Sequence, residues 1–427
     1  MPPPTVQDNP FIIVGAGIFG LSLAYELAAN RKYGNVVVLD RYAPPVPDGS
    51  SVDVSRIIRA DYADSFYGSL AVDAMKEWRN NPDWSSHFYD SGFLMLSSSR
   101  SHPYISQCRS QPVEVFEASE AEAKVRTLYP GVQAQLNGMT AVHNIQGGWA
   151  DARAAVQGLA ERCRQAGVVF LTGTAGTVAS LIKNGSRVVG VETVTGNRLL
   201  ADTVVLATGA WTNLVLPDFN LSLLATGQPV GFIQLTPQEA ARLGSMPVMI
   251  NFDTGVFCFP PTPGSHMLKL ARHGFGFATR VQTAENHVVS SPNLGGDNSV
   301  SGYLPEDAET ALRDGVKLFF PEFAHRAWAR LRMCWYTDTP RGDFVVDYHP
   351  SIEGLFLATG GSGHAFKFAP VLGRHIADCL QDKAPLALRN KWRARLPDQN
   401  LTEYLEGDGS RGGPPMRVVT QQEQARL

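Results

Sequence analysis

The amino-acid sequence predicts an α/β (α+β two-domain) protein in which a second domain interrupts a Rossmann-type dinucleotide-binding domain. Three features point to this fold. The chain has 427 residues, more than one hydrophobic core usually holds, so two domains are expected. A strand, a glycine turn, a helix and a second strand follow one another over residues 11–40. A strand, a glycine-rich loop and a helix return at residues 353–380.

The glycine turn is the first of these elements. The apolar run Phe11–Val14 is typical of a buried parallel strand, and three glycines follow it in G-x-G-x-x-G spacing. Gly15 permits a tight turn, Gly17 lets a pyrophosphate approach the backbone, and Gly20 lets helix and strand pack closely. The helix runs to about residue 30, and its N-terminus attracts phosphate. Asp40 closes the second strand, where its carboxylate can bind a ribose hydroxyl, so the complete pattern predicts dinucleotide binding rather than a chance glycine turn.

The middle of the chain continues this domain and then leaves it. A helix leads into a strand over residues 152–170, and candidate hairpin strands at 177–183 and 188–194 flank an Asn184-Gly185 turn signal. Between about residues 219 and 331, strand-like pieces replace the nucleotide-domain pattern. The predicted ranges are 1–86, 148–218 and 335–395 for the discontinuous nucleotide domain, 87–147 and 219–334 for the inserted substrate domain, and 396–427 for a C-terminal wrapping tail.

Composition excludes several classes of function. Hydrophobic residues make up 44% and charged residues 18%, as in a soluble globular protein, and the formal net charge of -3 gives no electrostatic case for nucleic acid or an acidic membrane. No apolar run approaches the roughly 20 residues that a membrane-spanning helix needs. The N-terminal "MPPPTVQDNP" lacks the basic and apolar regions of a secretory signal. We therefore expect an intracellular protein with no nucleic-acid or membrane partner.

The cysteines and the C-terminus add two expectations. The 5 cysteines are odd in number, far apart, and without C-x-x-C or Cys/His spacing, so neither a disulfide framework nor a metal site is expected. The last three residues, Ala425-Arg426-Leu427, have the small–basic–Leu order of a peroxisomal address. The alternative is a chance tripeptide on a polar tail, which would leave the protein in the cytoplasm.

Several segments together resemble the sarcosine oxidase and amadoriase (fructosyl amino acid oxidase) family of FAD-dependent amine oxidases over nearly the whole chain. They are "IIVGAGIFG", "SVDVSRIIRADYAD", "YDSGFLML", "GGWADARAAV", "LATGAW", "MLKLARH", "RMCWYTDTPRGDFVVDYHP" and "GSGHAFKFAPVLG". Within the family, residues 44–64 look most like the fungal L-saccharopine and L-pipecolate oxidases. The fructosyl members usually show Asn-Lys-Ile where this chain has Ser55-Arg56-Ile57.

The resemblance implies a flavoprotein fold of the sarcosine oxidase and glucose oxidase type, with FAD bound in the Rossmann domain and a mixed sheet in the inserted domain. The residues that it assigns to the cofactor are Gly15, Gly17, Ile18, Phe19, Gly20, Asp40, Arg41, Ser55, Arg56, Gly209, Trp211, Cys334, Gly361, Gly363, His364, Phe366 and Lys367.

Cys334 stands among large side chains in "RMCWYT". If this segment is a strand, Cys334 and Tyr336 share one face and Trp335 lies on the other. In the family, the aligned cysteine carries the flavin covalently as an 8α-thioether, with Tyr336 facing the substrate. The alternative is a buried free thiol, the usual state of a cysteine beside aromatic residues. With the resemblance, the covalent link is preferred.

Lys269 and His273 would point to the same face of a strand in "MLKLARH". In the family, this lysine holds a water against flavin N5 and speeds the reaction with oxygen, because a fixed ammonium stabilises the negative charge that develops on O2. The alternatives are a charge at a sheet edge for Lys269 and a satisfied core histidine for His273.

Arg56 and Arg59 are three residues apart, so on a helix they would share a face. The alternative to a functional role is that they form an exposed basic edge. The resemblance puts Arg56 over the flavin, and assigns the substrate carboxylate to Arg59 and Lys367. It also puts the helix near Pro370 with its positive end toward the flavin. Arg411, in the Gly-rich tail, resembles a carboxylate-binding arginine of fructosyl amino acid oxidases, and the alternative is a solvated loop.

These assignments predict an FAD-dependent oxidase of amino-acid-derived secondary amines, acting on CH–NH donors with O2 as acceptor. Hydride transfer to flavin N5 would give an imine and hydrogen peroxide. We expect a monomer whose partners are the small-molecule amine and O2, with no metal. The alternatives are a fructosyl amino acid oxidase, a tailoring amine oxidase of secondary metabolism, and an NAD-binding or catalytically silent binding protein.

Overall fold

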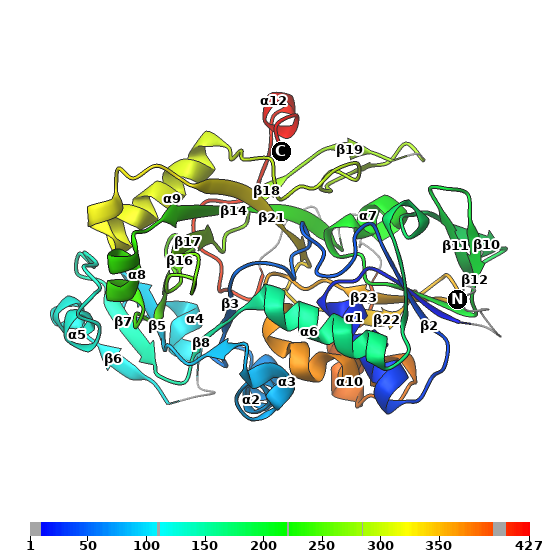
Figure 1. Ribbon diagram of the computed structural model, residues 1–427, viewed down its shortest axis with the longest axis horizontal. Coiled ribbons are helices and arrows are strands. Elements are labelled where there is room, and N and C mark those ends of the chain that lie inside the picture. The colour runs from blue at the N-terminus through cyan, green and yellow to red at the C-terminus, as the bar shows by residue number, and fades with distance from the viewer. Residues whose placement is uncertain (1–9, 109–111, 220–221, 284, 396–406) are drawn as a thin grey trace.

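The computed structural model describes residues 10–108, 112–219, 222–283, 285–395 and 407–427. Two large sheets dominate this part of the chain, and Figure 1 shows them side by side along the long axis of the molecule. One is a six-stranded, mostly parallel sheet with helices on one face. The other is a ten-stranded mixed sheet with one long helix against it. The fold is thus the predicted α/β class with a mixed second sheet.

The six-stranded sheet has the order β22-β23-β13-β1-β2-β9. Its neighbours pair in parallel, except for β22, which runs antiparallel to β23 at one edge. The inner strands are apolar runs buried on both faces, as helix-covered parallel sheets require. The strand bounds are β1 (Phe11–Val14), β2 (Val36–Asp40), β9 (Val169–Thr172), β13 (Thr203–Leu206), β22 (Val345–Tyr348) and β23 (Leu355–Thr359).

Helices cover one face of this sheet (Figure 1). They are α1 (Ile18–Tyr25), α2 (Ser65–Asn80), α6 (Ala152–Gln165) and α10 (Ala369–Leu380). A π-helical turn, Glu26–Asn30, extends α1 to the end that the sequence predicts. Helices α1 and α10 touch closely, because a Cβ on Gly373 would lie 2.2 Å from the carbonyl oxygen of Ser22.

A small antiparallel sheet covers the other face of the six-stranded sheet and shares a hydrophobic core with it. It consists of β10 (Val178–Asn184), β11 (Arg187–Thr193) and β12 (Arg198–Leu200). Strands β10 and β11 pair antiparallel around Gly185, whose φ of 60° suits a tight turn, so the hairpin predicted at Asn184-Gly185 is confirmed.

The second large sheet has the order β24-β18-β14-β17-β16-β15-β5-β7-β6, and β21 pairs with β14. Helix α9 (Glu306–Phe319) packs on one face over a hydrophobic core, and the opposite face carries Cys334. The strands are β5 (Phe93–Ser97), β6 (Glu114–Phe116), β7 (Thr140–Asn144), β14 (Leu224–Gln234), β15 (Val248–Asn251), β16 (Val256–Cys258), β17 (Met267–Arg272), β18 (Phe277–Ala278), β21 (Arg330–Asp338) and β24 (Arg417–Val418).

Short elements complete the described chain. One small sheet joins β3 (Arg56–Ile58), β8 (Gly148–Ala150) and β4 (Phe88–Tyr89), and a hairpin joins β19 (Val281–Gln282) to β20 (Val288–Val289). The remaining helices are α3 (Pro82–Ser85), α4 (Pro103–Gln107), α5 (Ala121–Leu128), α7 (Thr212–Val215), α8 (Pro237–Leu243), α11 (Leu386–Lys391) and α12 (Gln421–Gln424).

The segment around Arg56 corrects one expectation. Arg56 opens strand β3, which pairs antiparallel with β8, and Arg59 follows the end of that strand. The two arginines therefore do not share a helix face. Pairing with β8 decides the local structure here, over a sequence that would also suit a helix.

The predicted domain division remains a prediction, but two observations bear on it. All six strands of the parallel sheet fall inside the ranges expected for the nucleotide domain, whereas the boundary at residue 335 cuts β21. The tail carries β24 and α12, and β24 pairs with β18 of the large sheet. Residues 396–406 of the predicted tail lie outside the described residues. Within the described chain, no helix combines the length and apolar character needed to cross a membrane.

Candidate active site

A long cavity receives side chains from both large sheets. At one end lie the glycine turn after β1, the start of α1 and the end of β2. At the other end lie β17, β21 and the loop before α10. Residues far apart in the chain therefore meet in one cavity.

At the glycine end of the cavity, backbone segments lie so close together that only glycine fits at two positions. Gly15 has a φ of +113°, and a Cβ there would lie 2.3 Å from the carbonyl oxygen of Ala207. A Cβ on Gly20 would lie 1.9 Å from the carbonyl oxygen of Gly15, so this glycine lets helix and strand touch. Asp40 accepts a hydrogen bond from the Ala16 amide on Oδ2 (2.7 Å). Each carboxylate oxygen keeps a second lone pair for a further donor.

Arg41 borders the same end. Its guanidinium lies over the Trp211 ring, 4.6 Å from the centroid, and pairs with Asp48 at 2.9 Å. Arg41 also donates to the carbonyl oxygen of Leu294, from the segment that follows β20. This end of the cavity fits the adenosine and pyrophosphate parts of a dinucleotide. The glycine turn leaves room at the backbone, Asp40 offers a carboxylate at the end of β2, and Arg41 with Trp211 forms a flat, positively charged wall.

A buried cluster of charges stands at the other end. Asp53 Oδ2 lies 2.6 Å from Lys269 Nζ, 2.9 Å from Arg332 Nη2 and 2.7 Å from Arg56 Nη1. Burial opposes the ionisation of Asp53, but Arg332, Lys269 and Arg56 hold its pKa well below the usual range. Three cations thus share one carboxylate, which leaves net positive charge at this end of the cavity.

Lys269 is fixed within this cluster. Its ammonium bonds to Asp53 and to the Ser55 carbonyl oxygen (2.9 Å), which leaves one of its three N–H donors without a bond to a described residue. Burial lowers the pKa of Lys269 to about 8, Asp53 opposes this shift, and Arg56 adds to it. The side chain lines the cavity, so the remaining donor can hold a water or another small acceptor there.

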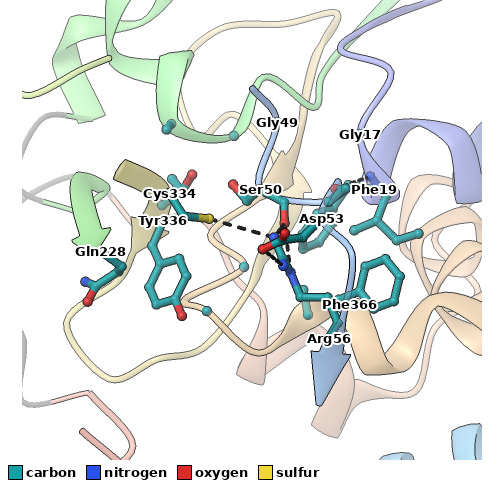
Figure 2. A pocket seen from close by; sticks show the side chains of 18 of the residues that line it. Gly17, Phe19, Gly49, Ser50, Asp53, Arg56, Gln228, Cys334, Tyr336 and Phe366 are labelled. Carbon is teal, nitrogen blue, oxygen red and sulfur yellow. Dashed lines mark hydrogen bonds and ion pairs between the residues drawn. The ribbon is translucent and has the colours of Figure 1, made fainter. Parts of the chain in front are cut away.

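Cys334 and Tyr336 both line the cavity from β21, while Trp335 is buried in the core beneath α9. The strand alternation predicted for this segment is confirmed. Figure 2 shows Arg56 between Asp53 and the sulfur of Cys334, which lies 3.8 Å from Arg56 Nη2. A Cβ on Gly363 would lie 2.4 Å from Cε2 of Tyr336, so the glycine-rich loop packs directly on that ring.

Arg59 is a buried cation that forms no close ion pair among the described residues, and the Asp61 carboxylate acts on it only at longer range. Its guanidinium lies 5.3 Å from the ring centroids of Tyr62 and Phe93 and 5.6 Å from that of Tyr104. Nη2 donates to the Tyr104 hydroxyl (3.2 Å), but Nη1 has no hydrogen-bond partner. A buried orphan donor in a cavity wall is costly unless a ligand satisfies it.

Lys367 stands near Arg59 at the head of a directed hydrogen-bond chain. Its ammonium donates to the Tyr62 hydroxyl (2.8 Å), and that hydroxyl bonds to Nδ1 of His364 (2.9 Å). His364 Nε2 faces the Gly342 carbonyl oxygen at 2.7 Å, so Nε2 carries the proton and Tyr62 donates to Nδ1. Burial, followed by the charge of Arg59, holds the pKa of Lys367 well below its usual range.

Arg411, for which a substrate contact was predicted, is bound by protein groups in this structure. It is buried, and both terminal nitrogens bond to the Asp338 carboxylate, at 3.0 Å and 2.5 Å. The same nitrogens also donate to the carbonyl oxygens of Gly274 (3.0 Å) and Ser362 (3.4 Å). Arg411 is not among the residues that line the cavity, and its four terminal N–H groups are engaged by the protein, so it holds the tail in place. Its contact with a substrate carboxylate stays a prediction.

The structure gathers most of the predicted site residues into one cavity wall. Those that line it are Gly15, Gly17, Ile18, Phe19, Asp40, Arg41, Arg56, Arg59, Gly209, Trp211, Lys269, His273, Cys334, Tyr336, Gly361, Gly363, His364, Phe366 and Lys367. Gly20, Ser55 and Arg411 do not. Gly20 acts through packing, and the buried Ser55 offers its carbonyl oxygen to Lys269.

Among the residues of the site that were not predicted, four have polar side chains with a clear place in it. Asp53 organises the charge cluster, and Ser51 accepts a hydrogen bond from the Ile18 amide at the start of α1 (2.8 Å). Asp408 and Ser410 line the cavity from the tail. Ser51 and Asp53 both belong to the motif "SVDVSRIIRADYAD", which marks the segment but not the contacts that these two residues make. Asp408 lies in "GDGS", which reads only as a turn.

Comparisons with known proteins agree with this geometry. The family model described as FAD dependent oxidoreductase matches residues 11–379. L-saccharopine oxidase of Schizosaccharomyces pombe is 34% identical over 422 residues, which cover 92% of this chain and 94% of that protein. Monomeric sarcosine oxidase of an Arthrobacter species is 26% identical over 386 residues, covering 87% of this chain and 92% of that protein.

A solved structure extends the likeness to three dimensions. The deglycating enzyme fructosamine oxidase (Amadoriase II) from Aspergillus fumigatus superposes with a TM-score of 0.84 at 30% sequence identity. The superposition covers 96% of this chain and 95% of the other. The two-sheet architecture therefore corresponds to that structure along almost its full length.

Proposed function

This chain belongs to the FAD dependent oxidoreductase family, and from that premise we propose that it oxidises secondary amines derived from amino acids, with O2 as the acceptor. One observation carries the proposal. Arg59 and Lys367 stand in the wall of the cofactor cavity without a close ion pair among the described residues, and Arg59 Nη1 has no hydrogen-bond partner there. A substrate carboxylate would supply what both groups lack.

The cofactor would be held along the whole cavity. The glycine turn, Asp40 and Arg41 suit the dinucleotide end, and Cys334 would hold the ring covalently through Sγ. When bound, FAD accepts a hydride from the carbon beside the amine and passes the electrons to O2, so that an imine and hydrogen peroxide form. Cys334, Tyr336 and Lys269 would then border the reacting end, with the Arg56 guanidinium 3.8 Å from the Cys334 sulfur (Figure 2).

The covalent link has its own test. Wild-type protein denatured in acid should keep its flavin absorbance, and Cys334→Ala should release the flavin into the supernatant. Cys258→Ala is the matched control, because Cys258 is a buried cysteine of the same sheet that does not line the cavity. If Cys334→Ala protein carries flavin through denaturation, the attachment point is elsewhere.

The residues of this chain position and polarise the substrate. Arg59 offers a planar fork and Lys367 a point charge, and together they would orient one carboxylate. The amine must be uncharged when the hydride leaves, because its lone pair assists that removal, so a substrate that binds as an ammonium first releases one proton to solvent. Lys269, fixed by Asp53, would stabilise the negative charge that develops on O2.

Within the family, residues 44–64 favour a saccharopine- or pipecolate-type substrate, and the relative named L-saccharopine oxidase supports that choice. The products would be the imine, or its hydrolysis or cyclisation product, and hydrogen peroxide. A fructosyl amino acid oxidase is the second candidate, because the superposed structure is a fructosamine oxidase.

A peroxide-release screen tests the proposed function. Purified holoenzyme would be offered saccharopine, pipecolate, sarcosine, N-methyl amino acids and fructosyl-lysine, with primary amino acids as controls. We expect peroxide from at least one of the first four substrates and a much lower rate from every primary amino acid. Peroxide from fructosyl-lysine alone would replace the first candidate by the second. Oxidation of primary amino acids alone would overturn both.

Location and oligomeric state are part of the same proposal. The C-terminal tripeptide, which follows α12, supports a peroxisomal location, and Arg426 of this tripeptide lies over the Tyr303 ring at 3.9 Å. A fluorescent protein fused to the N-terminus, with and without the last three residues, would test whether the tripeptide directs the chain. Ultracentrifugation would test the expected monomer.

A further inference from the structure

The C-terminal segment 407–413 forms part of the cavity wall and is anchored firmly to the body. The Gly407 amide donates to the Pro340 carbonyl oxygen (3.1 Å), and the Gly412 amide donates to that of His273 (3.2 Å). Between them, Arg411 is paired with Asp338. Asp408 and Ser410 lie between these anchors and line the cavity, so their side chains have defined positions there.

Asp408 is an acid in the same cavity wall as the cations Arg59 and Lys367. Its Oδ1 accepts hydrogen bonds from the amide (3.0 Å) and the hydroxyl of Ser410. Oδ2 accepts none from the described residues, and none of them forms an ion pair with Asp408. Burial opposes its ionisation, but His364, His273 and the Ser410 hydrogen bonds hold the pKa of Asp408 at about 2. Asp408 is therefore charged and forms no close ion pair among the described residues, although Lys367 and Arg411 lie within range of its charge.

The hydrogen bonds of Asp408 also determine which ring nitrogen of His273 carries the proton. An ionised carboxylate only accepts, so the Ser410 hydroxyl must donate to Asp408. Ser410 Oγ then accepts from His273 Nε2 (2.9 Å), which leaves Nδ1 as the acceptor nitrogen. Burial, with the charge of Arg411 adding to it, lowers the pKa of His273 to about 3, so this neutral tautomer is the working form. Asp408 Oδ2 and His273 Nδ1 are thus two acceptors without donors among the described residues.

We propose that Asp408, with His273 beside it, binds the ammonium group of the substrate, so that the cavity receives an amino acid as a zwitterion. The inference rests on the proposed function, because Arg59 and Lys367 bind the carboxylate of the same molecule. A secondary ammonium has two N–H donors, which match the two acceptors. A carboxylic acid without an amine would bring a second negative charge near Asp408 and no ammonium to neutralise it. Asp408 therefore selects amino acids over plain carboxylic acids.

Two unreactive ligands that differ only in charge test this role. Trimethylglycine carries a permanent cation beside its carboxylate, and 3,3-dimethylbutanoate is the neutral carbon isostere. Binding to the holoenzyme would be measured by perturbation of the flavin absorbance and by calorimetry. We expect wild type to prefer trimethylglycine by about tenfold or more, the scale of one close charge pair in a partly screened site. Asp408→Asn should abolish this preference and leave the affinity for 3,3-dimethylbutanoate equal or higher.

Asp307→Asn is the control, because it removes the same charge from the surface pair with Arg417, outside the cavity. It should keep the wild-type preference. Equal weakening of both ligands in Asp408→Asn would overturn the proposal in favour of a role in cavity shape, and an unchanged preference would overturn it as well. If wild type binds neither ligand, the carboxylate site of the proposed function fails. If it binds both ligands equally well, only the ammonium site fails.

Discussion

Two groups of buried cations face the same cavity, and they are arranged in opposite ways. Around Asp53, three cations share a carboxylate at 2.6–2.9 Å. Around Tyr62, Arg59 and Lys367 have hydroxyl and carbonyl partners but no carboxylate among the described residues. The first group is a finished structural unit. The second is complete only when an anion joins it.

The difference separates charges that hold geometry from charges that bind. A cation with an internal partner keeps a fixed position and contributes a steady field, as Lys269 does beside Asp53. A buried cation without one carries a desolvation cost that a ligand can offset. The comparison therefore predicts that removing a charge from the first group lowers stability, whereas removing one from the second lowers activity.

The largest effect is expected from Asp53→Asn. This change leaves three buried cations without a counter-ion, and the free energy of unfolding should fall by about 3–5 kcal/mol. Urea unfolding of the holoenzyme measures it. Asp307→Asn, which breaks the exposed pair with Arg417, should cost about 1 kcal/mol or less. A loss below about 1 kcal/mol in Asp53→Asn would mean that the cluster is not a structural unit.

Arg59→Met should lower activity and leave stability unharmed, the opposite of Asp53→Asn. It removes a buried cation that forms no close ion pair among the described residues, so the free energy of unfolding should stay equal or rise. The same variant should lose about 2–4 kcal/mol of kcat/KM on the best amine substrate, because the substrate carboxylate loses its charged donor. Stability and steady-state rates would be measured on one preparation. A strongly destabilised variant would contradict the distinction between the two groups.

Lys269→Met should slow the oxidative half-reaction by about 10²-fold or more, the usual scale for a lost preorganised electrostatic contact. Stopped-flow mixing of substrate-reduced enzyme with O2 measures this rate. Anaerobic reduction by substrate should change much less. Equal losses in both half-reactions would assign Lys269 to structure alone and move the oxygen-reacting group elsewhere.

The same lysine predicts a pH dependence. Because the pKa of Lys269 is lowered to about 8, the ammonium is present below that pH and is lost as pH rises through it. The rate constant for reaction with O2 should therefore be highest below about pH 8 and decline above it. The Lys269→Met variant should be slow and flat across this range. A wild-type rate that increases above pH 8 would have the wrong sign for a protonated lysine.

Arg411→Lys should have the smallest effect. Lysine keeps the charge opposite Asp338 but loses the two-nitrogen contact, so the free energy of unfolding should fall by about 1 kcal/mol. The ratio of kcat/KM for a long multi-carboxylate substrate to that for a short one should remain unchanged. Selective loss of the long substrate would restore the substrate contact that the sequence suggested for Arg411.

The sequence revealed those parts of the site that depend on local pattern. Gly15 and Asp40 follow from spacing within one βαβ unit, and alternation along a strand places Cys334 with Tyr336 and Lys269 with the cavity face. These rules need neighbours in the chain only. They were enough for the fold class and the glycine end of the cavity, whereas the resemblance to the family supplied most of the other residues of the cavity wall.

The remaining parts depend on contacts between distant segments. Asp53 matters because Lys269 and Arg332 reach it from other strands, which nothing near Asp53 indicates. Arg411 was expected near the substrate, but Asp338 on β21 binds its guanidinium first. Arg56 and Arg59 were expected on a helix, and pairing with β8 made a strand there. Tertiary partners decided each of these cases.

The most direct test of the carboxylate site is the ratio of kcat/KM for a secondary amino acid to that for its carboxamide. Wild type should favour the acid by about 2–4 kcal/mol, roughly 30-fold to 1000-fold, because only the carboxylate pairs with Arg59 and Lys367. In Arg59→Met the ratio should collapse toward one, through loss of rate with the acid and little change with the amide. If the variant discriminates against the amide as strongly as wild type does, Arg59 does not bind the substrate carboxylate, and the central assignment is wrong.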